Sequence, residues 1–411
     1  MNLYIDPGTG SMLFTVLLGV VGAAVYSARM LLLKLKMKVS GGKADISQVK
    51  IPIAIFADDK RYWNIFEPIC RELGNHGKEV VYLTASEDDP ALSCDLPNVK
   101  AEFIGKENRA FAKMNFLNAT ILLSTTPGLG VYQWKRSKGV DYYVHLFHAA
   151  NDVTLYRMFG IDYYDALLLS GDYQEKDIRA LEQLRELPKK ELVKVGIPYM
   201  DTMARRLQAQ GPGPNHGRTV LLAPSWGPSA IFSVYGGQII EQLLKTGYHV
   251  IVRPHPQSFT SEKELLDGLM AQYPESEQLE WNRDRDNFEV LRRSDILISD
   301  FSGVSFEFSL IYDKPIIYTD PGFDLSPYDA WWLKKPLWTQ SALPRIGCQL
   351  TEETMKDLKE LIDTCLEDPR YAHGRQTVKA ETWAYPGEGA KRAAAYLMAK
   401  YDELTQVKEG K

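Results

Sequence analysis

The stretch Asp295-Ile-Leu-Ile-Ser-Asp-Phe-Ser-Gly-Val304 predicts a buried strand that runs through a tight turn into a helix. The strand covers Ile296 to Ser299, and the helix covers Val304 to Ile311. The turn between them supplies hydroxyl groups and backbone N–H groups at the N-terminus of a helix, where phosphate groups bind readily. We therefore expect the turn to contact a phosphate-bearing ligand through Ser299, Asp300, Ser302, Gly303 and Val304.

The same alternation of strands and helices extends in both directions from this stretch. In the second half, strands are predicted at Thr219–Ala223, His249–Arg253 and Pro315–Thr319, with helices at Gly237–Lys245 and Ser261–Gln272 between them. In the first half, strands are predicted at Ile51–Ala57, Glu79–Thr84, Ala119–Ser124, Tyr142–Phe147 and Ala166–Ser170. Short apolar strands that alternate with helices indicate mainly parallel sheets covered on both faces. The sequence thus predicts two Rossmann-like, doubly wound α/β domains.

The segment from Gln208 to Gly217 is rich in Gly and Pro and separates the two periodic regions. We expect four parts, which are an N-terminal anchor with a basic flank (1–43), a first Rossmann-like domain (44–210), a second one (211–390) and a C-terminal helix (391–411) that could pack back on the first domain. The length of 411 residues suits two domains, and 45% hydrophobic with 25% charged residues is typical of a folded protein. A formal net charge of −5 indicates no global basic field, so no nucleic-acid partner is expected.

The N-terminal segment has the composition of a membrane span. From Met12 to Ala28 it contains no charged residue, and with Arg29 to Leu33 it reaches roughly the 20 residues that span a bilayer. Cations follow the apolar run, which by the positive-inside rule predicts a single-pass cell-membrane protein whose folded domains face the cytoplasm. A cleaved signal peptide and a buried or interfacial helix are the alternatives. The cations are Arg29, Lys34, Lys36, Lys38 and Lys43.

Further polar side chains follow other predicted strands, at the edge where open α/β sheets bind ligands. Arg253-Pro-His-Pro256 fixes a permanent cation and an imidazole, His255, between two prolines. Pro224-Ser-Trp-Gly227 offers Ser225 and an aromatic ring, Trp226, that could stack on a base or a sugar. In the first half, His148 ends a strand and would face the cleft as a general base, whereas His145 could lie in the core. A strand-end histidine is often only structural, and Ser-Asp before a helix is often a cap, but their joint placement favours a site.

These motifs resemble the CDP-glycerol glycerophosphotransferase family, whose members prime and polymerise wall teichoic acids and related phosphopolyol polymers. The resemblance runs from about Val144 to Asp320 and rests on the Arg253 and Ser299 motifs, on Lys314-Pro-Ile-Ile-Tyr-Thr-Asp320 and on Gly196-Ile-Pro-Tyr-Met-Asp201. It implies a GT-B architecture with the active site between the lobes. The family usually continues its first-lobe histidine as His-Gly-Thr-Pro-Leu-Lys, whereas this chain reads His148-Ala-Ala-Asn-Asp-Val-Thr.

The resemblance implies transfer of glycerol phosphate, or a similar polyol phosphate, from a CDP-activated donor to a lipid-linked or polymeric acceptor at the membrane. His148 would then deprotonate the acceptor hydroxyl, and Arg253 and His255 would stabilise charge on the diphosphate together with the turn after Ser299. No cofactor and no bound metal are required by this mechanism. The alternatives are a GT-B glycosyltransferase that uses a nucleotide sugar and a non-catalytic membrane scaffold with a degenerate transferase fold.

Overall fold

The computed structural model of the protein describes residues 50–214, 217–284, 286–300, 302–320, 322 and 324–409. Residues Ile51–Lys411 form one compact unit, and all structural statements below concern its described part. The predicted membrane span and its basic flank lie outside the described residues, as does Phe301. Within the described part, no helix is both long enough and apolar enough to cross a membrane.

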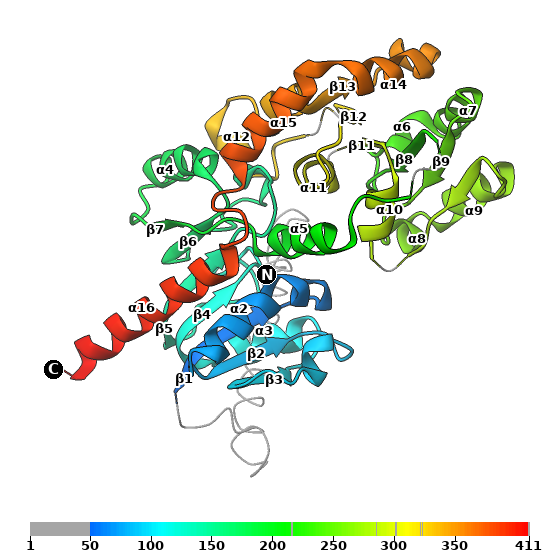
Figure 1. Cartoon of the computed structure of the whole chain (residues 1–411). Coiled ribbons are helices and arrows are strands. Elements are labelled where there is room, and N and C mark those ends of the chain that lie inside the picture. Colours follow the sequence, from blue (N-terminus) through cyan, green and yellow to red (C-terminus); the bar gives the residue numbers. More distant parts are fainter. Residues whose placement is uncertain are drawn as a thin grey trace, which may run out of the picture. The chain divides into compact units, whose positions relative to one another are not determined.

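Two fully parallel sheets organise the chain (Figure 1). The first has the order β3-β2-β1-β4-β5-β6-β7 and contains β1 (Ile51–Ala57), β2 (Val80–Thr84), β3 (Val99–Phe103), β4 (Asn118–Ser124), β5 (Gly139–Leu146), β6 (Ala166–Leu169) and β7 (Glu191–Lys194). The second has the order β10-β9-β8-β11-β12-β13 and contains β8 (Thr219–Ala223), β9 (His249–Val252), β10 (Leu279–Trp281), β11 (Ile296–Ser299), β12 (Ile316–Tyr318) and β13 (Gly347–Gln349). The two doubly wound sheets that the sequence predicts are therefore present. We call them, with their helices, the first and second lobes.

Helices connect the strands and cover both sheets. Those of the first half are α2 (Trp63–Asn75), α3 (Asn108–Met114), α4 (Glu175–Leu184) and α5 (Pro198–Gln210). Those of the second half are α6 (Ile231–Tyr235), α7 (Gln238–Lys245), α8 (Ser258–Ser261), α9 (Lys263–Gln272), α10 (Phe288–Arg293), α11 (Val304–Ile311), α12 (Ala330–Leu333), α13 (Trp338–Ile346), α14 (Leu358–Glu367), α15 (Pro369–Thr382) and α16 (Gly389–Glu409). A short 3-10 helix, η1 (Lys60–Tyr62), follows β1.

Alternate side chains of each strand enter cores on opposite faces, which explains why the strands are nearly continuous apolar runs. In β1, Ile53 and Ile55 pack with α2, whereas Phe56 contacts Phe111 of α3 from the other face, with 5.9 Å between ring centroids. In the second sheet, Leu221 belongs to the core that includes α11 and α13. The neighbouring Leu222 belongs to the core that includes α7, α9 and α14.

The chain passes between the lobes twice, at α5 and again before α16 (Figure 1). Asp201 of α5 locks the second passage, since its carboxylate accepts hydrogen bonds from Trp383 Nε1 at 2.8 Å and from the backbone N–H of Gly387 and Gly389 at 2.6 and 2.8 Å. Gly196 is required nearby, because its φ is +91° and a Cβ atom would lie 2.1 Å from the carbonyl oxygen of Ala384. The Gly-x-Pro-x-x-Asp element is thus a connection between the lobes.

Helix α16 returns to the first lobe and packs beside α2, where it contributes buried side chains to the core of the first sheet. These side chains are Ala393, Ala394 and Leu397. Helix α5 contributes Met200 and Met203 to the core of the second sheet. The four domain ranges expected from the sequence stay predictions.

Candidate active site

The polar residues singled out in the second half lie along one edge of the second sheet. Strand β8 lies between β9 and β11, and all three are parallel, so the loops that follow them leave the sheet at the same edge. These loops carry Ser225 and Trp226 after β8, Arg253 and His255 after β9, and Ser299 to Val304 after β11. The sequence and the parallel topology together therefore bring the predicted donor-binding residues to one edge.

Two of these residues join the loops to each other. Asp300 is buried, and its carboxylate accepts hydrogen bonds from the backbone N–H of Ser225 at 2.9 Å and of Ile231 at 3.2 Å. Burial raises the pKa of Asp300, and the hydrogen bonds oppose this shift. Ser299 is also buried and donates its hydroxyl proton to the carbonyl oxygen of Ala223 at 2.7 Å. Both side chains hold the edge together, and their predicted contact with a donor phosphate stays a prediction.

The N-terminus of α11 faces the space between the lobes. Ser302, Gly303 and Val304 are all half-buried, and the Val304 N–H lies 3.4 Å from the Ser302 hydroxyl oxygen. A Cβ atom at Gly303 would lie 3.3 Å from Oδ1 of Asn151, which belongs to the loop after His148 in the first lobe. The predicted phosphate turn and the predicted histidine loop therefore meet across the cleft.

A cation and an imidazole flank this turn on the β9 side. The half-buried Arg253 guanidinium donates a hydrogen bond to Oδ1 of Asn282, and burial lowers its pKa while leaving it a cation. His255 Nδ1 accepts a hydrogen bond from the Gln257 N–H at 3.1 Å. Burial and the charge of Arg61 lower the pKa of His255, so its ring is neutral at pH 7. Trp226 is 47% exposed at the same edge.

His148 follows β5 and is held by its neighbours in the first lobe. The Thr125 hydroxyl donates to the carbonyl oxygen of Leu146 at 2.9 Å and also contacts His148 Nδ1. Because the hydroxyl proton is already donated, we assign the proton of the neutral imidazole to Nδ1, which leaves Nε2 as an acceptor. The ring of Tyr62 packs edge-on against the imidazole, with 5.3 Å between centroids. Burial, and then the charge of Arg61, lower the pKa of His148 to about 4.

His145 lies in the core, as its position on the strand allowed. It is fully buried among the rings of Phe147, Tyr156 and Tyr164, with its Nε2 3.2 Å from the Tyr156 hydroxyl. Burial is the main cause that lowers its pKa, to about 3. Of the two histidines of this segment, only His148 lies at the cleft.

Two charged residues of the site region were missed by sequence reasoning. Arg61 is not among the residues expected at the site, yet its charge acts on both His148 and His255, and Asp59 orients it by accepting from its N–H and Nε at 2.9 Å. The signal was available, since η1 directly follows strand β1. Glu307 of α11 accepts a hydrogen bond from Asn287 at 3.3 Å, and burial raises its pKa to about 7. Glu307 is half-buried, and only the fold shows this partial burial.

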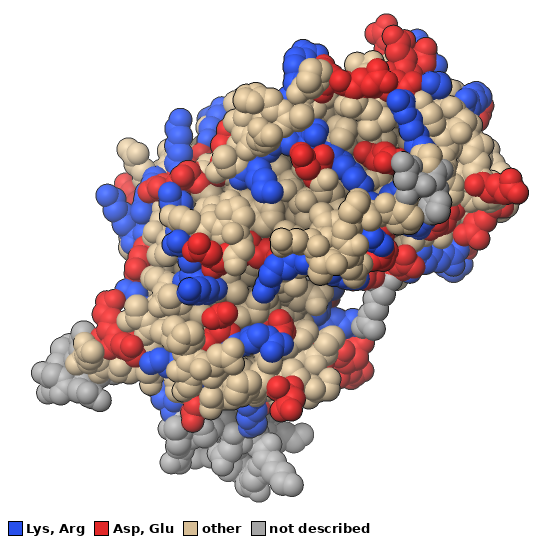
Figure 2. Space-filling model, viewed as in Figure 1, with Lys and Arg blue, Asp and Glu red and all other residues tan. Residues whose placement is uncertain are grey.

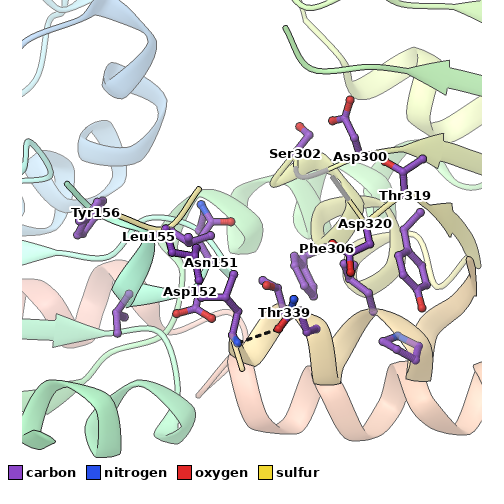
Figure 3. A pocket seen from close by; sticks show the side chains of 18 of the residues that line it. Asn151, Asp152, Leu155, Tyr156, Asp300, Ser302, Phe306, Thr319, Asp320 and Thr339 are labelled. Atoms are coloured by element: carbon purple, nitrogen blue, oxygen red, sulfur yellow. Dashed lines mark hydrogen bonds between the residues drawn. The ribbon is translucent and has the colours of Figure 1, made fainter. Parts of the chain in front are cut away.

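A cavity of 490 Å³ opens between the His148 loop and the second lobe (Figure 3). The first lobe contributes His148, Asn151, Leu155 and Tyr156 to its wall, and the second contributes residues that follow β11 and β12 and residues of α13. In Figure 3 the labelled side chains of Asn151 and Tyr156 lie on one side, and those of Ser302 and Asp320 lie on the other. Arg253, His255, Ser225 and Trp226 do not line this cavity. Among the described residues, no cluster of three or more His, Cys, Asp or Glu side chains could hold a metal ion.

Residues 158–392, more than half of the chain, match the family model described as CDP-Glycerol:Poly(glycerophosphate) glycerophosphotransferase. The match begins after His148 and extends beyond Asp320, so it starts later and ends later than the resemblance seen in the motifs. No curated protein sequence matches the chain.

Solved structures share the fold at low sequence identity. A structure of the wall teichoic acid polymerase TagF is 15% identical with a TM-score of 0.56, covering 92% of this chain and 98% of that one. A putative UDP-N-acetylglucosamine 2-epimerase from Listeria monocytogenes is 12% identical with a TM-score of 0.56, covering 86% and 98%. The UDP-GlcNAc 2-epimerase of Methanocaldococcus jannaschii is 12% identical with a TM-score of 0.53, covering 84% and 99%. These similarities confirm the predicted GT-B-like α/β fold.

Proposed function

Because the chain belongs to the CDP-glycerol:poly(glycerophosphate) glycerophosphotransferase family, we propose that it moves glycerol phosphate, or a related polyol phosphate, from a CDP-activated donor to a lipid-linked or polymeric acceptor in the synthesis of a teichoic-acid-like cell-envelope polymer. This proposal is carried by one observation, which is that two different kinds of chemical group face each other across one cleft. A neutral imidazole, His148, lies on the first lobe, and a cation with a helix N-terminus lies on the second.

In the proposed reaction, the acceptor hydroxyl attacks the distal phosphorus of the donor diphosphate. His148 Nε2 takes the hydroxyl proton, a new P–O bond forms, and the bond to the bridging oxygen breaks so that CMP leaves with its electron pair. The Nδ1–H of His148 points its proton at Thr125, which keeps Nε2 free to act as the base. General-base catalysis of this kind contributes roughly 10²- to 10⁴-fold to a rate.

The second lobe is suited to the charge that develops on the diphosphate. Arg253 supplies a permanent cation, and the N-terminus of α11 supplies backbone N–H groups and the positive end of a helix dipole. His255, neutral when free, could donate one ring proton to a phosphate oxygen. Phosphoryl transfer needs mainly positioning and electrostatic stabilisation, which this edge can provide.

Residence at the cell membrane, with both lobes in the cytoplasm, belongs to the proposal as well. It is supported by the apolar run from Met12 to Ala28 and the cations that follow it. Trp331 and Trp332 add exposed aromatic surface, at 55% and 38%. Fractionation of cells that express the full chain or a chain without residues 1–43 tests this part. We expect only the full chain to stay in the membrane pellet after an alkaline carbonate wash, and equal release of both would overturn the anchor.

The activity is tested with purified full-length protein, CDP-glycerol labelled in the glycerol, and a glycerol phosphate oligomer as acceptor. We expect label to enter the oligomer with release of one CMP for each unit added. CDP-ribitol and UDP-sugars serve as competing donors. Release of UDP without CMP would instead favour a nucleotide-sugar glycosyltransferase. Two results together would favour a scaffold. The purified protein would turn over none of the donors, and cells would still synthesise the polymer with His148→Ala but not after deletion of the chain.

A further inference from the structure

The cavity between the lobes borders the turn after β11, through Asp300 and Ser302, but not Arg253 and His255, which follow β9. Among the described residues that line it, none is a lysine or an arginine, whereas Asp152, Asp300 and Asp320 all contribute to its wall. Asp300 is held by backbone N–H groups of the second lobe, and Asp152 accepts from the Trp338 N–H at 2.6 Å. A diphosphate placed here would meet carboxylates and no cation, which is electrostatically unfavourable.

The remaining polar groups of the wall are suited to hydroxyl groups. Asp320 lies at an exposed position, with a carboxylate that accepts only from the Gly322 N–H, at 3.2 Å, among the described residues. The Gln340 carboxamide uses its oxygen to accept from the Leu337 N–H at 3.1 Å, so its NH₂ group remains a donor. Gln349 adds a second, exposed carboxamide. A carboxylate accepts from hydroxyl groups, and a carboxamide both donates and accepts.

Much of the rest of the wall is apolar, through residues of both lobes. Leu155 and Tyr156 lie on the first-lobe side, and Phe306, Leu337 and Leu343 lie on the second-lobe side. A wall of this kind packs against C–H groups, while a few polar groups orient the ligand. The volume of 490 Å³ falls within the range of small-molecule sites. The cavity therefore fits a neutral, hydroxyl-bearing group such as a polyol or a sugar residue.

The position of His148 indicates which substrate carries the neutral, hydroxyl-bearing group that fits the cavity. His148 lines the cavity, so a hydroxyl group bound there lies beside the proposed base, and Asn151, which also lines it, lies against Gly303 at the N-terminus of α11. We propose that the cavity binds the neutral terminal residue of the acceptor, while the donor diphosphate lies outside it, on the side of Arg253 and His255. This inference rests on the proposed function and adds the chemical class of the acceptor end and its place.

Two probes and three variants test the inference with the purified full chain. The probes are glycerol phosphate oligomers that cannot react, one ending in an O-methylated glycerol and the other in a phosphate. Calorimetry in the absence of donor should show the neutral-ended oligomer binding at least tenfold more tightly than the phosphate-ended one. Leu343→Trp, which fills the cavity, should weaken binding of the neutral oligomer at least tenfold, and the affinity for CDP-glycerol should stay within twofold.

Leu343→Met is the matched control, because it keeps the volume of the side chain, and we expect it to bind both ligands normally. Gln349→Ala, at an exposed position, should weaken binding of the neutral oligomer and leave donor binding unchanged, and it covers the case in which the tryptophan variant fails to fold. Equal loss of donor and oligomer affinity in these variants would place the donor in the cavity and overturn the inference. Unchanged oligomer binding in both would overturn it too. Because calorimetry needs no turnover, failure of the proposed reaction is read separately, in the CMP assay.

Discussion

The two sides of the cleft are built in different ways. On the first lobe, one imidazole depends on side chains, since Thr125 fixes its proton and Tyr62 packs against its ring. On the second lobe, the edge depends on the backbone, since Asp300 and Ser299 tie neighbouring loops together and α11 presents its own N–H groups. The family match covers the second side and begins only after His148. The donor side is therefore the half of the site that the family match covers, whereas the role of the His148 loop rests on its geometry.

Because the two sides are built differently, we expect mutations to separate the chemical step from donor binding. Changes on the first side should lower turnover and leave donor affinity intact, whereas changes on the second side should weaken the donor first. On the face shown in Figure 2, Lys and Arg lie interspersed with Asp and Glu.

The largest effect is expected for His148→Ala, which removes the proposed base. We expect kcat to fall by roughly 10²- to 10⁴-fold, while the Kd of CDP-glycerol measured by calorimetry changes less than twofold. His373→Ala, at an exposed position on α15, is the matched control and should keep full activity. A His148 variant that retains wild-type kcat would remove this residue from the reaction.

Arg253→Ala should come next, because it removes a half-buried cation from the donor edge. Loss of a charge-assisted hydrogen bond, worth about 1.5–3 kcal/mol, predicts a Kd for CDP-glycerol about 10- to 100-fold higher. Arg253→Lys should recover part of the affinity, since it keeps the charge and loses the planar fork. Arg370→Ala, an exposed arginine of the same lobe that pairs with Asp368, is the control. Unchanged donor affinity in the alanine variant would contradict a role of Arg253 in donor binding.

Thr125→Val tests whether the reaction depends on the tautomer of His148 that Thr125 holds. The valine keeps the shape of the side chain but cannot accept from His148 Nδ1, so we expect kcat to fall about tenfold, in line with the net value of one hydrogen bond. KM for the donor should not change, and Thr125→Ser should restore most of the rate. If serine fails to rescue, the hydroxyl group is not what matters at this position.

The smallest effect concerns pH. The lowered pKa of His148, about 4, means that the ring is the free base above that pH and becomes protonated as pH falls through it. We expect the acidic limb of kcat/KM, which reports the free enzyme, near pH 4, and the limb of kcat at higher pH because the bound diphosphate stabilises the imidazolium. Full pH profiles of both constants measure this.

Arg61→Ala sharpens the pH comparison, because the charge of Arg61 is the second cause of the lowered pKa. Removing it should move the limb of kcat/KM upward by less than about one pH unit. Two outcomes would contradict the electrostatic account of His148. One is a wild-type acidic limb of kcat/KM near the ordinary pKa of histidine, and the other is a limb that moves to lower pH in the Arg61 variant.

The buried strands were predictable from the sequence, and the edge strands of the first sheet were not. Strands β1, β8 and β11 begin and end at the predicted residues, because each is an apolar run buried on both faces. Strands β3 and β7 were missed, since they lie at the two edges of the first sheet and no residue of either is fully buried. A half-exposed edge strand such as Val-Lys-Ala-Glu-Phe carries no apolar run to mark it.

The candidate site, too, was predictable from the sequence only in part. A local rule, that ligands bind where parallel strands end, is enough to find His148, Arg253 and the turn before α11. The rule says nothing of which side chains are already engaged, so it could not show that the polar atoms of Ser299 and Asp300 join loops of this part of the sheet.

The sequence by itself determined the order of the buried strands and of the helices between them, and the residue types where those strands end, because both follow from short-range periodicity and turn chemistry. Only the tertiary structure decided that Arg61 acts on both histidines, that partial burial raises the pKa of Glu307 and that a cavity without lysine or arginine among its described residues opens beside His148. The physical reason is that burial and the field at a charged group depend on elements far apart in the chain. Here η1 meets the loop after β5 only once the first sheet has formed, and that loop meets α13 only once the two lobes are packed together.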